Sequence, residues 1–136
     1  MKPTTTSAFV LSLDFELFWG VYESRGSEYY PAIENVFKVV PNLLGLFEKY
    51  GISCTWATVG ALCLEDFEAF ERYKPKNLPR YVNKSLSPYE DVSNIASLNK
   101  KLLFAPELVN QILRTPRQEI GAHTFSHFYT LEPGAS

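Results

Sequence analysis

Three short segments, at residues 7–16, 52–60 and 118–123, limit the folds that this chain of 136 residues can adopt. The first two are rich in β-branched and aromatic residues and are hydrophobic nearly throughout, which is typical of strands buried on both faces of a parallel sheet. A helical pattern separates the first two segments, and another precedes the third. Strand, helix and strand at this spacing form a βαβ unit, so we expect an α/β fold with parallel strands.

The alternation within residues 7–16 assigns its two faces, because successive side chains of a strand point in opposite directions. One face carries large apolar residues, namely Phe9, Leu11, Leu13 and Phe15. The other face carries smaller and acidic residues, namely Ala8, Val10, Ser12, Asp14 and Glu16. We expect helices to cover the large apolar face and the small, acidic face to line the inside of a barrel.

Three segments show helical signals. Residues 35–51 carry an apolar stripe at helical spacing, with Gly51 placed to end the helix and Pro41 either beginning the main helix or kinking it. Residues 64–74 form a plausible short helix, and residues 105–116 a third, bounded by proline at each end.

Residues 75–94 lose all periodicity and are crowded with Pro, Asn, Ser and Tyr. We interpret them as a long surface excursion, either a functional segment or a surface decoration. The segment follows the second strand, so we expect it to pack beside the mouth of a site at the carboxyl ends of the strands.

Three strands are roughly half of what a (β/α) barrel needs. The expected fold is therefore the N-terminal half of a distorted (β/α) barrel, truncated where the chain ends. Its last strand would have an unpaired edge, so we expect either self-association through that exposed barrel edge or a loosely folded chain.

Composition narrows the partners and the compartment. Charged residues make up 21% and the net charge is −2, which gives no reason to expect nucleic acid or a membrane as partner. The first residues lack the long uncharged apolar run of a secretory signal, and Cys54 and Cys63 are too few for a disulfide framework. The expected location is cytoplasmic.

The two histidines of the chain, His123 and His127, stand four residues apart directly after the third segment. That spacing puts two imidazoles on one side of a helical turn, close enough to share a metal ion such as zinc. Asp14 and Glu16 end the first segment, and the carboxyl ends of parallel strands are where active sites form. Two histidines and one carboxylate leave positions open for water and substrate, while the second carboxylate can accept a proton. Taken singly, however, each motif can also be chance, a cap or a loop start.

The stretches "LSLDFE", "SCTWATVG" and "EIGAHTFSH" resemble, in order and spacing, those of the polysaccharide deacetylases, the carbohydrate esterases that include chitooligosaccharide deacetylases. The resemblance implies a divalent metal, usually Zn²⁺, held by an acid and two histidines. It assigns Asp14 as the catalytic base, Glu16, His123 and His127 as metal ligands, and Thr124 as the residue that braces the loop. Many members have adjacent acids where this chain has Asp-Phe-Glu, so which acid binds the metal is left open.

The same resemblance implies a hydrolase that removes N- or O-acetyl groups from an acetylated carbohydrate, with residues 1–136 as a partial catalytic domain. The family's later motifs, including a histidine that acts as general acid, have no counterpart here, so this chain alone is expected to be inactive. No residue is assigned to substrate binding. Two alternatives are hydrolysis of C–N bonds in a small non-sugar amide, and a non-catalytic module that keeps the fold or binds carbohydrate.

Overall fold

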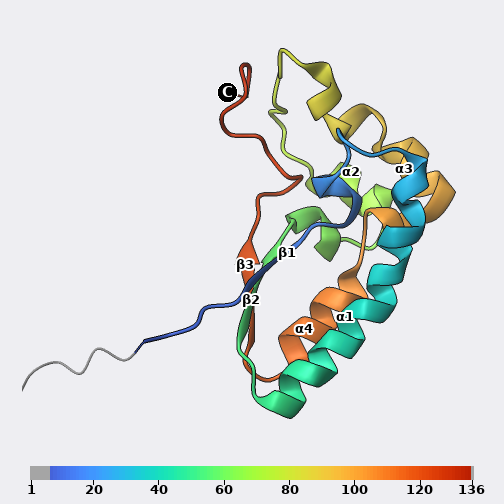
Figure 1. Ribbon diagram of the computed structural model, residues 1–136. Helices are drawn as coiled ribbons and strands as arrows, with labels where there is room; N and C mark the ends of the chain where they lie inside the picture. The colour runs from blue at the N-terminus through green and yellow to red at the C-terminus, as the bar shows by residue number, and fades with distance from the viewer. Residues whose placement is uncertain (1–6, 136) are drawn as a thin grey trace, which may run out of the picture.

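The computed structural model describes residues 7–135 and contains a three-stranded parallel sheet (Figure 1). The strands are β1 (Ser12–Phe15), β2 (Cys54–Thr58) and β3 (Gln118–Ala122), and they lie in the order β1–β2–β3. Both pairs are parallel, with Asp14 opposite Ala57 and Ala57 opposite Gly121. The expectation of an α/β fold with parallel strands is confirmed at this level.

Four α-helices accompany the sheet in residues 7–135: α1 (Tyr30–Tyr50), α2 (Phe67–Tyr73), α3 (Val92–Asn99) and α4 (Pro106–Arg114). Helices α1 and α4 lie side by side against one face of the sheet (Figure 1). Short 3-10 turns join the elements: η1 (Leu17–Gly20), η2 (Ser27–Tyr29), η3 (Gly60–Cys63), η4 (Lys84–Leu86), η5 (Pro88–Glu90) and η6 (Lys100–Leu102). None of the helices in this range is long and apolar enough to cross a membrane.

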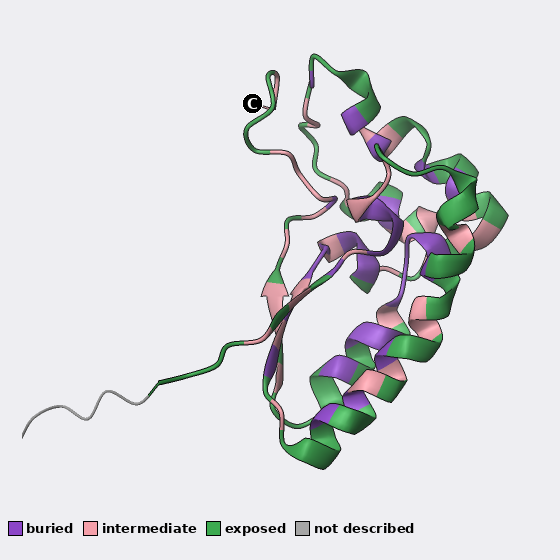
Figure 2. Ribbon diagram, viewed as in Figure 1, coloured by how far each residue is buried: buried purple, intermediate pink, exposed green. Residues whose placement is uncertain are grey.

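The two faces of the sheet differ as the alternation predicts. Phe15 and Trp56 are buried in the core, whereas Ser12, Asp14 and Glu119 are exposed. Figure 2 shows buried segments where the helices and the sheet face each other. In register across the three strands, the open face carries small or polar residues, namely Ser12, Asp14, Thr55, Ala57, Glu119 and Gly121. The large apolar face of β1 therefore points to the helices, as expected.

The first strand is shorter than predicted, since β1 begins at Ser12 and not at residue 7. Phe9 is 90% exposed and Val10 is 80% exposed, so the expectation that helices cover Phe9 is wrong. The reason is pairing: Thr55 N–H donates to Leu11 O, and residues 7–10 extend past the start of β2, where no strand lies beside them. Hydrophobicity alone does not reveal where a partner strand ends.

The helices follow their signals with two differences. Helix α1 begins at Tyr30, earlier than predicted, and runs through Pro41 to a left-handed cap at Gly51 with φ of 65°. Helix α3 was missed, because it starts inside the aperiodic segment 75–94 and buries only Val92 and Ile95.

Candidate metal centre

Three side chains converge at the carboxyl end of the sheet. The Glu16 carboxylate Oε2 lies 3.2 Å from His123 Nε2 and 3.3 Å from His127 Nε2. Glu16 directly follows β1 and His123 directly follows β3, so each strand delivers one of them to the same place. Within residues 7–135, these three residues are the ones whose ligand atoms gather closely enough to hold a metal ion, all within 4.8 Å of one another.

The spacing of these atoms fits a divalent cation. In a tetrahedral site with metal–ligand bonds of about 2.0–2.1 Å, two ligand atoms lie about 3.3–3.4 Å apart. The distances from Glu16 Oε2 to the two imidazoles match that edge. The three side chains are 22–32% exposed, so the site is sheltered but reachable from solvent.

Unpaired buried polar atoms point to the same place. In the described part of the chain, the buried side-chain atoms without a hydrogen-bond partner are His123 Nε2, His127 Nδ1 and Tyr129 Oη. The approach of His123 Nε2 to Glu16 lacks hydrogen-bond alignment, although the two atoms are close. Leaving such an atom unpaired costs about 1–3 kcal/mol, and coordination of an ion by His123 Nε2 would offset that cost.

The chain around Glu16 is anchored by buried residues on its carboxyl side. Leu17 adopts a left-handed conformation with φ of 49°, which turns the chain out of β1 and into η1. Leu17, Phe18 and Trp19 are all buried, and the Trp19 indole N–H donates to Leu103 O at 2.8 Å. Trp19 N–H also donates to Glu16 O at 3.1 Å. The backbone at Glu16 is therefore fixed by the core.

The histidine segment is a turn and not a helix, which corrects the helical turn inferred from the spacing. Thr124 has φ of 60° and His127 has φ of 57°, so both take the left-handed conformation that side chains normally avoid. The chain thereby reverses between the two histidines, and their rings lie 5.1 Å apart. Convergence of the imidazoles arises from these two residues and not from helical periodicity.

Backbone contacts to β2 and η3 hold one side of this turn. His123 N–H donates to Thr58 O at 3.0 Å, Gly60 N–H to Thr124 O at 2.8 Å, and Ala61 N–H to Phe125 O at 2.9 Å. The Thr124 hydroxyl accepts from Phe128 N–H at 2.7 Å, a contact within the turn itself.

Residues of the excursion at 75–94 contact the other side of the turn that carries the two histidines. The Tyr81 hydroxyl accepts from Tyr129 N–H at 3.0 Å, and the Tyr89 hydroxyl lies 2.7 Å from Ser126 Oγ. Arg80 N–H also donates to Gly134 O, so the two segments run side by side at the upper end of the molecule in Figure 1. The expectation that this excursion packs beside the site, at the carboxyl ends of the strands, is confirmed.

Asp14 lies apart from the three-residue cluster. It is exposed on the open face of β1, and its side chain makes no hydrogen bond or ion pair with another residue in 7–135. Asp14 stands within β1, two residues before Glu16, which follows the strand. The structure brings Glu16 to the histidines and leaves Asp14 outside.

Tyr129 was missed by the sequence reasoning, although it follows His127 by two residues. Its ring packs edge-on against His127, with the centroids 5.1 Å apart. Burial first, and then the nearby carboxylates of Glu23 and Glu16, raise the pKa of Tyr129 well above its usual range. Tyr129 is therefore a neutral phenol beside the cluster. The sequence offered one signal for Tyr129, namely the aromatic pair of Phe128 and Tyr129 directly after His127.

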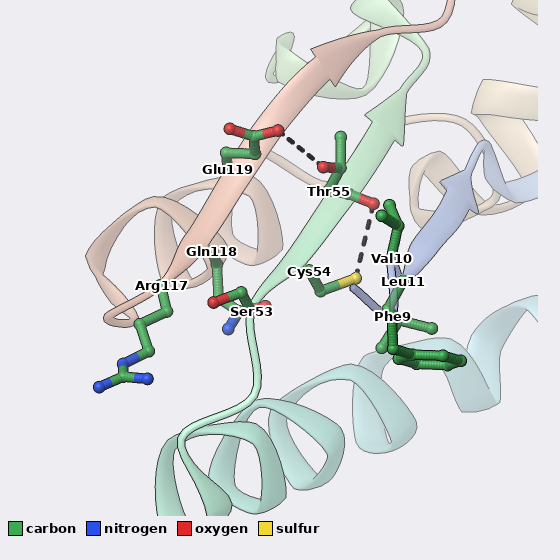
Figure 3. Close-up of a pocket in the computed structure, with 9 residues that line it drawn as sticks. All are labelled: Phe9, Val10, Leu11, Ser53, Cys54, Thr55, Arg117, Gln118 and Glu119. Atoms are coloured by element: carbon green, nitrogen blue, oxygen red, sulfur yellow. Dashed lines mark hydrogen bonds between the residues drawn. The ribbon is translucent and has the colours of Figure 1, made fainter. Parts of the chain in front are cut away.

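A separate hollow of about 430 Å³ lies at the opposite end of the sheet (Figure 3). Residues before and at the start of the three strands line it, among them Val10, Cys54 and Arg117. It contains no histidine, and its one acid, Glu119, accepts a hydrogen bond from Thr55 at 2.6 Å. The convergent chemistry is at the carboxyl end and not in this hollow.

Comparisons of the chain with protein-family models, with curated proteins and with solved structures found no match. A function for the site is therefore inferred from its geometry. A carboxylate and two imidazoles that meet at the carboxyl end of a parallel sheet suit a divalent cation with coordination positions left for water and substrate.

Proposed function

We propose that this chain carries the metal centre of a hydrolase that removes N- or O-acetyl groups from a carbohydrate, as in the polysaccharide deacetylases. The observation that supports the proposal is the convergence of Glu16 Oε2 on both histidine Nε2 atoms, at 3.2 and 3.3 Å. Catalytic zinc sites use three protein ligands of this kind and keep a position open, whereas structural sites are closed by four.

The proposed fold is the N-terminal half of a distorted (β/α) barrel. Its support is the contrast between the two faces of the sheet, since helices cover one face and the open face carries small and polar residues. In the described part, β1 and β3 are both edge strands. Unpaired edges favour pairing with another chain, so we also propose self-association through them, which light scattering would detect.

In the proposed chemistry, Glu16, His123 and His127 hold the cation. A divalent cation bound there would supply Lewis-acid polarisation of an acetyl carbonyl and make water more acidic. Asp14, within β1 and two residues before Glu16, is the proposed base that accepts a proton from water. Its exposure leaves the carboxylate free to do so.

Two other functions share this site geometry. A hydrolase of C–N bonds in a small non-sugar amide would use the same cation and the same base. A non-catalytic module would keep the same three-residue cluster without turnover. A cytoplasmic location remains our proposal, supported by a cysteine pair in which Cys54 is buried and Cys63 exposed, both as free thiols.

Acetate release tests the proposal. The zinc-loaded product of the complete gene that contains residues 1–136 is incubated with N-acetylated chitooligosaccharides, O-acetylated xylan and simple amides. We expect acetate from an acetylated sugar, and no acetate from residues 1–136 alone. Cleavage of only the non-sugar amides would favour the first alternative. Zinc uptake without any cleavage would favour the second.

A further inference from the structure

Gly20 lies directly beneath the carboxylate of Glu16. Gly20 ends the 3-10 turn η1, and Glu16 is the residue that precedes that turn. A Cβ built on Gly20 would lie 1.9 Å from Glu16 Cδ, 2.0 Å from Oε1 and 2.5 Å from Cγ. All three of its nearest atoms would belong to Glu16. The glutamate side chain therefore fills the volume that a side chain at position 20 would need.

We propose that Gly20 is a positioning residue for the metal centre, because its missing side chain lets the Glu16 carboxylate reach both histidines. This inference rests on the proposed metal-binding function. Contacts shorter than 3.0 Å force one of the two groups to move. The backbone of η1 is held by Phe18 and Trp19, which are 3% and 1% exposed, so the flexible glutamate is the group that gives way.

The requirement at position 20 is for space and not for a special backbone. The glycines with positive φ in the described chain are Gly51 and Gly134, so Gly20 has a conformation that alanine can adopt. A Gly20→Ala protein should fold, with its Glu16 carboxylate displaced. Gly45 supplies a matched control, since it is exposed in α1 and a Cβ there would meet no atom within 4 Å.

The test compares wild type, Gly20→Ala, Gly45→Ala, Glu16→Gln and the double variant Gly20→Ala/Glu16→Gln. Zinc affinity is measured by competition with a chromophoric chelator, and folding by circular dichroism and thermal melting. We expect Gly20→Ala to weaken zinc binding about 10- to 100-fold, as is typical when a residue that orients a ligand is changed. Gly45→Ala should bind as the wild type does. In the double variant, the alanine should add no further loss to that of Glu16→Gln, because both changes act through the same carboxylate.

A second readout needs no metal. In metal-free protein labelled with ¹⁵N-histidine, Gly20→Ala should shift the same imidazole NMR signals as Glu16→Gln, and Gly45→Ala should shift neither. If the wild type binds no zinc, the proposed metal-binding function is wrong. The histidine signals then decide the role of Gly20 alone, and signals that Gly20→Ala leaves unchanged would overturn that role.

If the wild type binds zinc, a folded Gly20→Ala protein with wild-type affinity would overturn the proposal. Should Gly20→Ala unfold, the variant Gly20→Ala/Glu16→Ala decides, since removal of the glutamate removes the collision. Recovery of folding in that variant would support the proposal. If it also unfolds, Gly20 serves the fold and not the site, and the proposal is wrong.

Discussion

Glu16 Oε2 lies 3.2 Å from His123 Nε2, although the two residues follow the two outer strands of the sheet and β2 lies between those strands. Neighbouring strands are about 4.8 Å apart, so β1 and β3 are separated by roughly 10 Å. Both side chains must therefore reach inward over the end of β2. The site depends on the turn that follows each outer strand, and less on the strands themselves.

Tyr81→Phe tests the turn that carries the histidines. The change removes the hydroxyl that accepts from Tyr129 N–H and leaves that N–H without its partner. This hydrogen bond is part-buried, so its loss should cost about 1 kcal/mol, and we expect zinc affinity to fall about 5-fold. Tyr73→Phe is the control, because Tyr73 is exposed. Equal zinc affinities for the two variants would mean that Tyr81 does not hold the turn.

Gly51 and Gly45 should respond to alanine with opposite signs. Gly51 caps α1 with φ of 65°, a conformation in which a Cβ costs about 1–2 kcal/mol, so Gly51→Ala should lower the free energy of unfolding. Gly45 is exposed inside the same helix, and Gly45→Ala should raise the free energy of unfolding by up to about 1 kcal/mol. Urea denaturation measures both. A stabilising Gly51→Ala would show that the cap is not left-handed.

Tyr22→Phe should change how stability depends on alkaline pH. The Tyr22 hydroxyl donates to Asp91 at 2.5 Å, and burial, followed by that hydrogen bond and the charges of Asp91 and Glu90, raises the pKa of Tyr22. A raised folded-state pKa gives stability that is fully present below the ordinary tyrosine value of about 10 and lost as pH rises through the folded value.

The wild type should accordingly be more stable than Tyr22→Phe by about 1 kcal/mol at pH 7. Above pH 10, the stability of the wild type should fall more steeply, and the difference between the two proteins should shrink. Urea denaturation at pH 7, 9, 10 and 11 provides the comparison. A difference that stays constant to pH 11 would mean that Tyr22 titrates alike in the folded and unfolded states.

The sequence predicted the parts of this fold that depend on local pattern. The segments around β2 and β3, the cap at Gly51 and the covered face of Leu13 and Phe15 all follow from hydrophobic spacing and glycine chemistry. The first strand was predicted to be too long. The apolar character of Phe9 does not show where the neighbouring strand β2 begins.

The sequence predicted which residues form the site but not how the chain arranges them. Glu16, His123 and His127 were named from residue type and position, and the structure brings them together. The turn that does so depends on left-handed residues, and local sequence does not favour that conformation at the β-branched Thr124. Contacts from Tyr81 and Tyr89 stabilise that turn from a distant segment, and no local pattern encodes them.

The central claim is that Glu16, His123 and His127 bind one divalent cation, and cobalt substitution tests it most directly. Co²⁺ is titrated into metal-free wild type, Glu16→Gln, His123→Ala, His127→Ala and Asp14→Asn, and the visible absorption of the protein-bound ion is followed. We predict one Co²⁺ per wild-type chain, displaced by Zn²⁺, with at least tenfold weaker binding when any of the three ligands is changed and wild-type binding in Asp14→Asn. A wild type that takes up no cobalt or zinc, or a Co²⁺ spectrum unchanged by His123→Ala and His127→Ala, would contradict the account. Loss of the ion in Asp14→Asn but not in Glu16→Gln would show that the two acids have exchanged roles.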